Sequence, residues 1–83
     1  MATRNIPRKN VIGERMKESR LNRAFKVTQE DLSSLLEAYG VTLTQASISK
    51  IEAGGRPVYD FELKAIGAAL AVRVGWLMDE EEL

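Results

Sequence analysis

The sequence predicts an all-α protein built from five helices. Apolar residues recur at helical spacing in several segments, and these segments are bounded by N-cap residue types and by glycines. No segment shows the strict alternation of a half-buried strand, and there is no internal repeat. The chain has 83 residues, of which 45% are hydrophobic, a length and composition typical of one small domain with its own core.

The first helix is predicted to begin at Asn10, an N-cap residue type, with Ile12 and Met16 one turn apart on its core side. The helix fades near "LNRAFKV", where Phe25 and Val27 are expected to fill the core. Residues 1–9 contain a proline and several basic residues, and we expect them to form a flexible basic arm.

The second helix should start after Thr28, because "TQED" is close to a capping box with Asp31 in the third helical position. Its apolar stripe follows the i, i+3, i+4, i+7 spacing of one helix face and consists of Leu32, Leu35, Leu36 and Tyr39. Gly40 suits the end of this helix.

The third helix is expected over about residues 45–53, after the N-cap Thr44. Ile48 and Ile51 point to one side of this helix. The opposite side carries short and hydrogen-bonding side chains, namely Gln45, Ala46, Ser49 and Lys50. A helix that only filled a core would be more apolar, so this exposed face requires an explanation.

The fourth helix is predicted to start near Asp60, with Leu63, Ile66 and Leu70 as its core stripe. A last short helix around residues 75–78 includes Trp76 and Leu77, which are expected in the core or, as the alternative, at a dimer contact. Residues 79–83, "DEEEL", form an acidic tail.

Composition excludes several classes of function. The chain has no cysteine and no histidine, which removes disulfides, thiolate metal sites and the commonest general base. It has no phosphate-binding loop, and we expect no enzyme activity, no metal, no cofactor and no small-molecule ligand. No apolar run reaches the roughly 20 residues of a membrane span, and the N-terminus lacks a secretory signal, so a cytoplasmic protein is expected.

The charges are distributed unevenly although the net charge is +0. Residues 1–26 hold eight basic and two acidic residues, a net charge of +6, and residues 27–83 hold four basic and ten acidic residues, a net charge of −6. Such asymmetry fits a polyanionic partner for the basic side, or a solvated helix face with a soluble tail. Charge alone leaves both alternatives open.

Two helices joined by a short connection, the second with a polar exposed face, describe a helix-turn-helix. An α-helix fits the major groove of B-DNA, where the base edges present distinct donors and acceptors. Gln45 could pair bidentately with adenine, Lys50 could reach guanine, Ala46 could accept a thymine methyl, and Ser49 could bond to a base or a phosphate. The exposed face would then be short and polar because it must approach DNA closely.

The segments "TQEDL", "TQASISKIEAGGRP", "ELKAIGAALAV" and "WL" resemble the lambda-repressor-like (Cro/C1-type, XRE family) helix-turn-helix domain. The resemblance covers residues 10–78. It implies that Gln29 contacts a DNA phosphate and that the start of the third helix reads bases, which adds Thr44 to the four exposed residues above. It also implies a structural pair between Arg20, late in the first helix, and Glu52, late in the third.

The chain departs from the family pattern in its spacing. About five residues are added through "EAYGVTL", before the third helix, and we expect the second helix to be one turn longer. Arg56 follows the third helix and is expected to bind a phosphate. Arg4, Arg8 and Lys9 either do the same through the arm or are simply solvated.

The sequence therefore predicts a sequence-specific transcriptional regulator, a repressor that binds double-stranded DNA as a homodimer on an inverted-repeat operator. The alternative is a protein-interaction module of the same fold that binds another regulator or a toxin. The neutral net charge and the acidic second part of the chain favour this alternative, whereas the polar third helix and the basic first part favour DNA.

Overall fold

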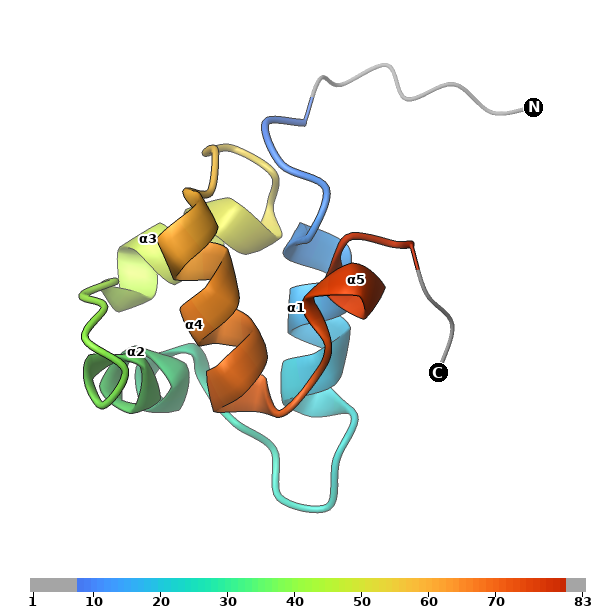
Figure 1. Ribbon diagram of the computed structural model, residues 1–83. Coiled ribbons are helices and arrows are strands. Elements are labelled where there is room, and N and C mark those ends of the chain that lie inside the picture. The colour runs from blue at the N-terminus through green and yellow to red at the C-terminus, as the bar shows by residue number, and fades with distance from the viewer. Residues whose placement is uncertain (1–7, 81–83) are drawn as a thin grey trace.

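A computed structural model describes residues 8–80, and within this range the chain forms five helices and no strand (Figure 1). The helices are α1 (Gly13–Leu21), α2 (Gln29–Glu37), α3 (Gln45–Glu52), α4 (Asp60–Leu70) and α5 (Val74–Leu77). The prediction of an all-α fold with five helices is confirmed. None of these five helices has the length and apolar character that a bilayer span requires.

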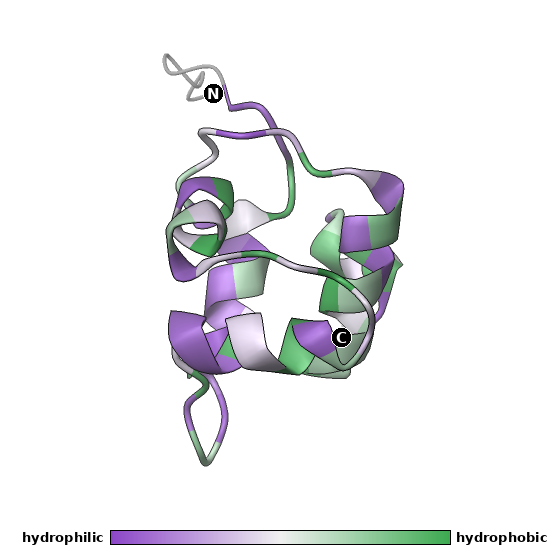
Figure 2. Cartoon of the chain, turned by 90° about the vertical axis from the view of Figure 1, so that its left-hand side faces the viewer, coloured by the Kyte–Doolittle hydropathy of each residue, from purple (hydrophilic) through white to green (hydrophobic). Residues whose placement is uncertain are grey.

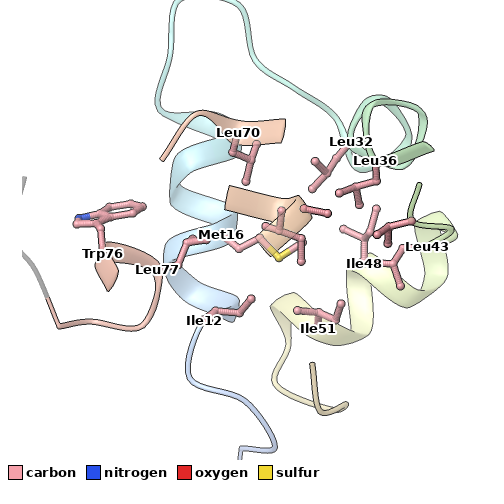
Figure 3. Packing of buried hydrophobic residues seen from close by; sticks show 13 residues of the cluster. Ile12, Met16, Leu32, Leu36, Leu43, Ile48, Ile51, Leu70, Trp76 and Leu77 are labelled. Atoms are coloured by element: carbon pink, nitrogen blue, oxygen red, sulfur yellow. The ribbon is translucent and has the colours of Figure 1, made fainter. Parts of the chain in front are cut away.

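Helix α4 lies at the centre of the bundle and packs against α1, α2 and α5, while α3 packs against α2 and α1 (Figure 1). Hydrophobic and hydrophilic residues are interspersed along the helices (Figure 2), as in amphipathic helices around a shared core. The buried apolar side chains come from every helix, from the residue before α1 and from the connection before α3 (Figure 3). They are Ile12, Met16, Leu32, Leu36, Val41, Leu43, Ile48, Ile51, Ala65, Ile66, Leu70, Trp76 and Leu77.

Local chemistry fixes the starts of the helices. Thr28 and Asp31 form the predicted capping box, with Thr28 Oγ1 accepting from Asp31 N at 2.9 Å and Asp31 Oδ2 accepting from Thr28 N at 3.0 Å. Hydrogen bonding of the Asp31 carboxylate to the backbone N–H of Thr28, and to the Thr28 side chain, lowers the pKa of Asp31. Thr44 caps α3 by accepting from Ser47 N at 3.1 Å. Both predicted caps are confirmed.

Helix α1 begins at Gly13, so the prediction that it begins at Asn10 is wrong by one turn. Asn10 still caps the segment, because its Oδ1 accepts from the backbone N–H groups of Ile12 at 3.1 Å and Gly13 at 2.9 Å. Its Nδ2 donates to the carbonyls of Ile51 and Arg56. Asn10 therefore joins the start of α1 to the end of α3, and residues 10–12 lie before the helix.

Three residues that were expected to face the core are exposed. Phe25 is 88% exposed because residues 22–27 leave the helical body as a projecting loop (Figure 1). Arg20 closes the base of this loop: its carbonyl accepts from Val27 N at 3.0 Å, and its Nη1 donates to Val27 O at 2.8 Å. Val27 packs against the core as expected, but Leu35 and Tyr39 of the predicted α2 stripe are exposed.

The residues "EAYGVTL" lie mostly in the connection between α2 and α3. α2 ends at Glu37, and residues 38–44 lead to α3 through Gly40, whose φ is +78°. That this helix is one turn longer than in the family stays a prediction. The predicted arm, residues 1–9, falls outside the described residues except for Arg8 and Lys9, which are docked on the end of α3.

Candidate nucleic-acid interface

The N-termini of α2 and α3 meet through the side chains of their first residues. Gln45 Nε2 donates to Gln29 Oε1 at 2.6 Å, and Gln29 Nε2 donates to Glu52 Oε1 at 3.0 Å. Gln29 is half-buried and Gln45 is exposed. The structure thus brings together a residue predicted to bind a phosphate and a residue predicted to read a base.

The predicted pair between Arg20 and Glu52 is confirmed and forms the base of this chain of hydrogen bonds. Arg20 Nε donates to Glu52 Oε2 at 2.7 Å, and Arg20 Nη2 donates to Glu52 Oε1 at 2.8 Å. Both side chains are buried, with relative accessibilities of 7% and 4%. The hydrogen bonds that Arg20 donates to Glu52, together with the negative charge of Glu52, raise the pKa of Arg20 against the opposing effect of burial.

The chain of bonds fixes the orientation of each amide. An ionised carboxylate only accepts hydrogen bonds, so Gln29 must present its NH₂ group to Glu52 and its carbonyl oxygen to Gln45. Gln45 must in turn donate to Gln29. The bond to Gln29 uses one N–H of the Gln45 amide and leaves its second N–H and its carbonyl oxygen for other partners. This donor and acceptor pair matches the major-groove edge of adenine.

The remaining residues of the predicted base-reading set are exposed on α3. Ala46, Ser49 and Lys50 share the outer side of the helix, while Ile48 and Ile51 on the other side are fully buried. Thr44 is exposed as well, but its hydroxyl is used by the cap and by Ser47 Oγ at 3.1 Å. Helix α3 therefore presents one narrow polar face beside Gln29.

Arg56 has a different environment from the one predicted. Its Nη1 and Nη2 each donate to the carboxylate of Glu62 at 3.0 Å, and Nη1 also donates to Pro57 O. Glu62 additionally accepts from Tyr59 N at 3.0 Å, which completes the cap of α4. Contact between Arg56 and a phosphate stays a prediction, and it would have to compete with this ion pair.

The ion pair between Arg56 and Glu62 shifts the pKa of both side chains. The hydrogen bond to Glu62 raises the pKa of Arg56. Burial alone would raise the pKa of Glu62, but the hydrogen bonds from Arg56 and Tyr59 N outweigh it and lower that pKa. The arrangement holds the carboxylate in its charged form at the junction between α3 and α4.

Much of the positive charge in the first part of the chain is used inside the fold. Arg8 donates to the carbonyls of Glu52 at 3.1 Å and Ala53 at 3.3 Å, at the end of α3. Arg23 donates to Ser19 O and, across the fold, to Leu70 O, each within 2.9 Å. These arginines act as bridges between elements, so the charge asymmetry of the sequence overstates the basic surface.

Arg15 has the same role between α1 and α5. It donates to Trp76 O at 2.9 Å, its guanidinium lies 4.8 Å from the Trp76 ring centroid, and it pairs with Asp79 at 2.7 Å. Asp79 thus belongs to the fold rather than to a free acidic tail, of which residues 81–83 lie outside the described part. Trp76 and Leu77 are buried, as expected of core residues.

One basic residue near the polar face is absent from the set that the sequence predicts. Lys26 is exposed and lines a groove of about 530 Å³ together with Thr28, Gln29 and Gln45. Its position two residues before the Thr28 cap is the signal that could have indicated it, because that spacing places it beside the N-terminus of α2. Lys26 thus adds a positive charge beside Gln29 and Gln45, and Lys50 is exposed on α3.

No protein-family model, curated protein or solved structure matches the chain. Among residues 8–80, no group of three or more aspartate or glutamate side chains is arranged to hold a metal ion. A function is therefore inferred from the geometry of α2 and α3 together with the motif resemblance.

Proposed function

We propose that this chain is a lambda-repressor-like helix-turn-helix regulator that places α3 in the major groove of DNA. One observation carries the proposal: Gln45, at the first position of α3, is held by Gln29, at the first position of α2, and Gln29 is held by the buried Glu52. A side chain that is oriented before binding loses little conformational freedom on contact and can discriminate between bases. A merely solvated glutamine would have no such support.

In this proposal the residues divide into two groups. Gln45, Ala46, Ser49 and Lys50 face the base edges, while Gln29, the N–H groups at the start of α2, and Lys26 face the phosphate backbone. Base contacts specify the sequence and phosphate contacts position the helix. Because α3 has only eight residues, one copy contacts few base pairs, so we propose a dimer on an inverted repeat with half-sites about 34 Å apart.

The test is selection of bound sequences from a random duplex library, followed by titration of the enriched site. We expect an inverted repeat, and we expect Gln45→Ala to lose preference at one base pair of each half-site. Ser34→Ala, on the exposed side of α2, serves as the matched control. Selection of no sequence, or of sequences that Gln45→Ala binds equally well, would contradict the proposal.

A second candidate function is a protein-interaction module of the same fold. The observation that favours it is the internal use of Arg8, Arg15, Arg20 and Arg23, which leaves less positive surface for a polyanion. Under this alternative, binding to random duplex stays weak at low salt, whereas the regulator should bind random DNA with a clear salt dependence.

A further inference from the structure

Three exposed aromatic side chains gather on the side of the molecule formed by α4 and the end of α2. Tyr39 is 52% exposed, Phe61 is 59% exposed and Tyr59 is 60% exposed. The Tyr59 and Phe61 rings are stacked, with centroids 5.8 Å apart. Single exposed apolar residues are ordinary on a protein surface, but a contiguous group of this kind marks an interaction site.

Tyr39 and Phe61 border a groove of about 380 Å³, and Tyr59 lies next to it through its stacking on Phe61. One wall is formed by Tyr39, Gly40 and Val41, and the other by the outer side of α4, namely Phe61, Lys64, Ala65 and Ala68. Lys64 is the one charged residue in this lining, and no residue of α3 belongs to it. An occupant of the groove would therefore leave the polar face of α3 free.

We propose that the occupant is a second copy of this chain, and that Phe61 of each copy packs into the groove of the other. A two-fold contact requires a projecting group and a recess on the same face of the molecule. Phe61 is a large exposed side chain, and Ala68 is a small exposed one that lines the same groove. These two residues are seven positions apart on α4, about 10.5 Å along one side of the helix.

A two-fold axis beside Lys64 and Ala65 brings these features together. It runs the two α4 helices antiparallel and sets Phe61 of one copy over Ala68 of the other, so that a large side chain faces a small one. The tyrosines at 39 and 59 then close the sides of the contact. The lone charge, Lys64, can extend its ammonium to solvent beside the axis.

The available area fits a weak dimer. An aromatic side chain buries about 150–250 Å², and these three are more than half exposed, so they offer roughly 250–450 Å² per copy. Together with the rest of the groove, the total surface area that two copies would bury approaches ~1,000 Å², the lower limit for a specific interface. The choice of a second copy rests on the proposed function, because an inverted repeat requires two copies of α3 and the lining carries no charge pattern that would select a foreign chain.

Sedimentation velocity without DNA tests the self-association directly. We expect reversible dimers with a dissociation constant of roughly 10–500 μM, and a weakening of at least ~10-fold in Phe61→Ser. Phe25→Ser is the matched control, because Phe25 is an exposed aromatic on the projecting loop, and it should leave association unchanged. A parent protein that stays monomeric at about 1 mM, or equal loss in both variants, overturns the proposal.

Cross-linking locates the axis. The chain has no cysteine, so one introduced thiol is unique. Lys64→Cys should form disulfide-linked dimers at least ~10-fold faster than Lys17→Cys, an exposed position on α1, because a disulfide needs Cα atoms within about 7 Å. Equal rates overturn the two-fold arrangement. If the protein self-associates but selects no DNA site, the proposed function is wrong and the interface stands. If the protein selects an inverted repeat that Phe61→Ser binds equally well, the interface is wrong and the proposed function stands.

Discussion

The side chain of Gln45 donates to Gln29 across 2.6 Å, so the first residue of α3 is held by the first residue of α2. Gln29 is itself held by Glu52, the last residue of α3, at 3.0 Å. The two helices are therefore connected at the surface by a chain of bonds that ends in a buried ion pair. Changes at Glu52 or Gln29 should reach the proposed DNA contacts through Gln45.

A double-mutant cycle tests this coupling. Gln45→Ala and Gln29→Ala should each weaken cognate DNA binding by ~1–3 kcal/mol, and the double variant should lose less than the sum, by at least about 0.5 kcal/mol, because both remove the same bond. The measurement is titration of a selected site at constant salt. Ser34→Ala is the control for substitution on α2. Strictly additive losses would mean that the two glutamines act independently.

The ion pair between Arg20 and Glu52 should dominate stability. Glu52→Gln removes one member of a buried pair and leaves the charge of Arg20 without its partner, which typically costs ~3–5 kcal/mol. Arg20 also closes the projecting loop through Val27, so the loop should loosen with it. Urea denaturation checks this prediction against Glu37→Gln, an exposed glutamate on α2. Equal midpoints for the two variants would count against a structural role for the pair.

Substitutions of Lys50 and Arg56 should have different effects, the first on base preference and the second on the free energy of unfolding. Lys50 is exposed on the outer side of α3, and Lys50→Ala should cost ~1–3 kcal/mol on the cognate site and relax preference at one base pair per half-site. Arg56→Ala should instead lower the unfolding free energy, because it leaves the buried carboxylate of Glu62 without its bidentate partner. The two variants are compared by urea denaturation and by titration of cognate and random DNA.

The salt dependence decides the role of Arg56. If Arg56 also binds a phosphate, as the sequence predicts, Arg56→Ala flattens the salt slope by about one unit for each phosphate that the variant no longer neutralises. An unchanged slope with reduced stability would assign Arg56 to the fold alone. A loss of base preference in Arg56→Ala but not in Lys50→Ala would show that the orientation proposed for α3 is wrong.

The features that the sequence predicts well are those set by local chemistry. The caps at Thr28 and Thr44 depend on residues three positions away, so the short motif contains all the information. Periodicity also finds the buried sides of α3 and α4. Phe25 is predicted wrongly because hydrophobicity does not reveal that the chain leaves the body of the fold and returns through the two hydrogen bonds between Arg20 and Val27.

The partners of the arginine side chains could not be predicted from local sequence. A long guanidinium side chain can reach partners far along the chain, and only tertiary structure decides which one. Arg8 binds carbonyls at the end of α3, and Arg23 reaches Leu70 O, so neither role could be derived from local spacing. The same holds for the candidate site. The sequence predicts Gln29 and Gln45 as separate DNA-binding residues, but the hydrogen bond between them depends on how α2 packs on α3.

Acid should destabilise the protein through Glu62. An ordinary glutamate has a pKa of about 4.3, and the pKa of Glu62 is lowered in the folded state. The charged carboxylate therefore contributes stability that is fully present above the unfolded pKa and is lost as pH falls through the lower, folded pKa. Urea denaturation between about pH 6 and pH 3 should show a shallower acid limb for Glu62→Gln than for the parent, while Glu37→Gln retains the parent's slope.

Gly13→Ala should destabilise the protein although it lies in a helix. Alanine in place of a helical glycine ordinarily stabilises by about 0.5–1 kcal/mol. Here a Cβ on Gly13 would lie 2.4 Å from Ile51 O and 2.8 Å from Glu52 O, and backbone atoms of α3 cannot move without separating the helices. We therefore expect a net loss of ~1–3 kcal/mol, the range for overpacking of a well-packed site.

Gly55→Ala is the matched control for this prediction. Its Cβ would meet only Lys50 O, at 3.6 Å, an ordinary contact, so its melting temperature should stay near that of the parent. Gly54→Ala should fall between the two, because Gly54 has a φ of +79° and its Cβ would meet the side chain of Arg8, which can withdraw where a backbone cannot. Thermal unfolding of the three variants should rank Gly55→Ala above Gly54→Ala and Gly54→Ala above Gly13→Ala. If Gly13→Ala melts higher than the parent, α1 does not approach the end of α3 as closely as described, and the contacts of Asn10 with the Ile51 and Arg56 carbonyls would have to be reconsidered with it.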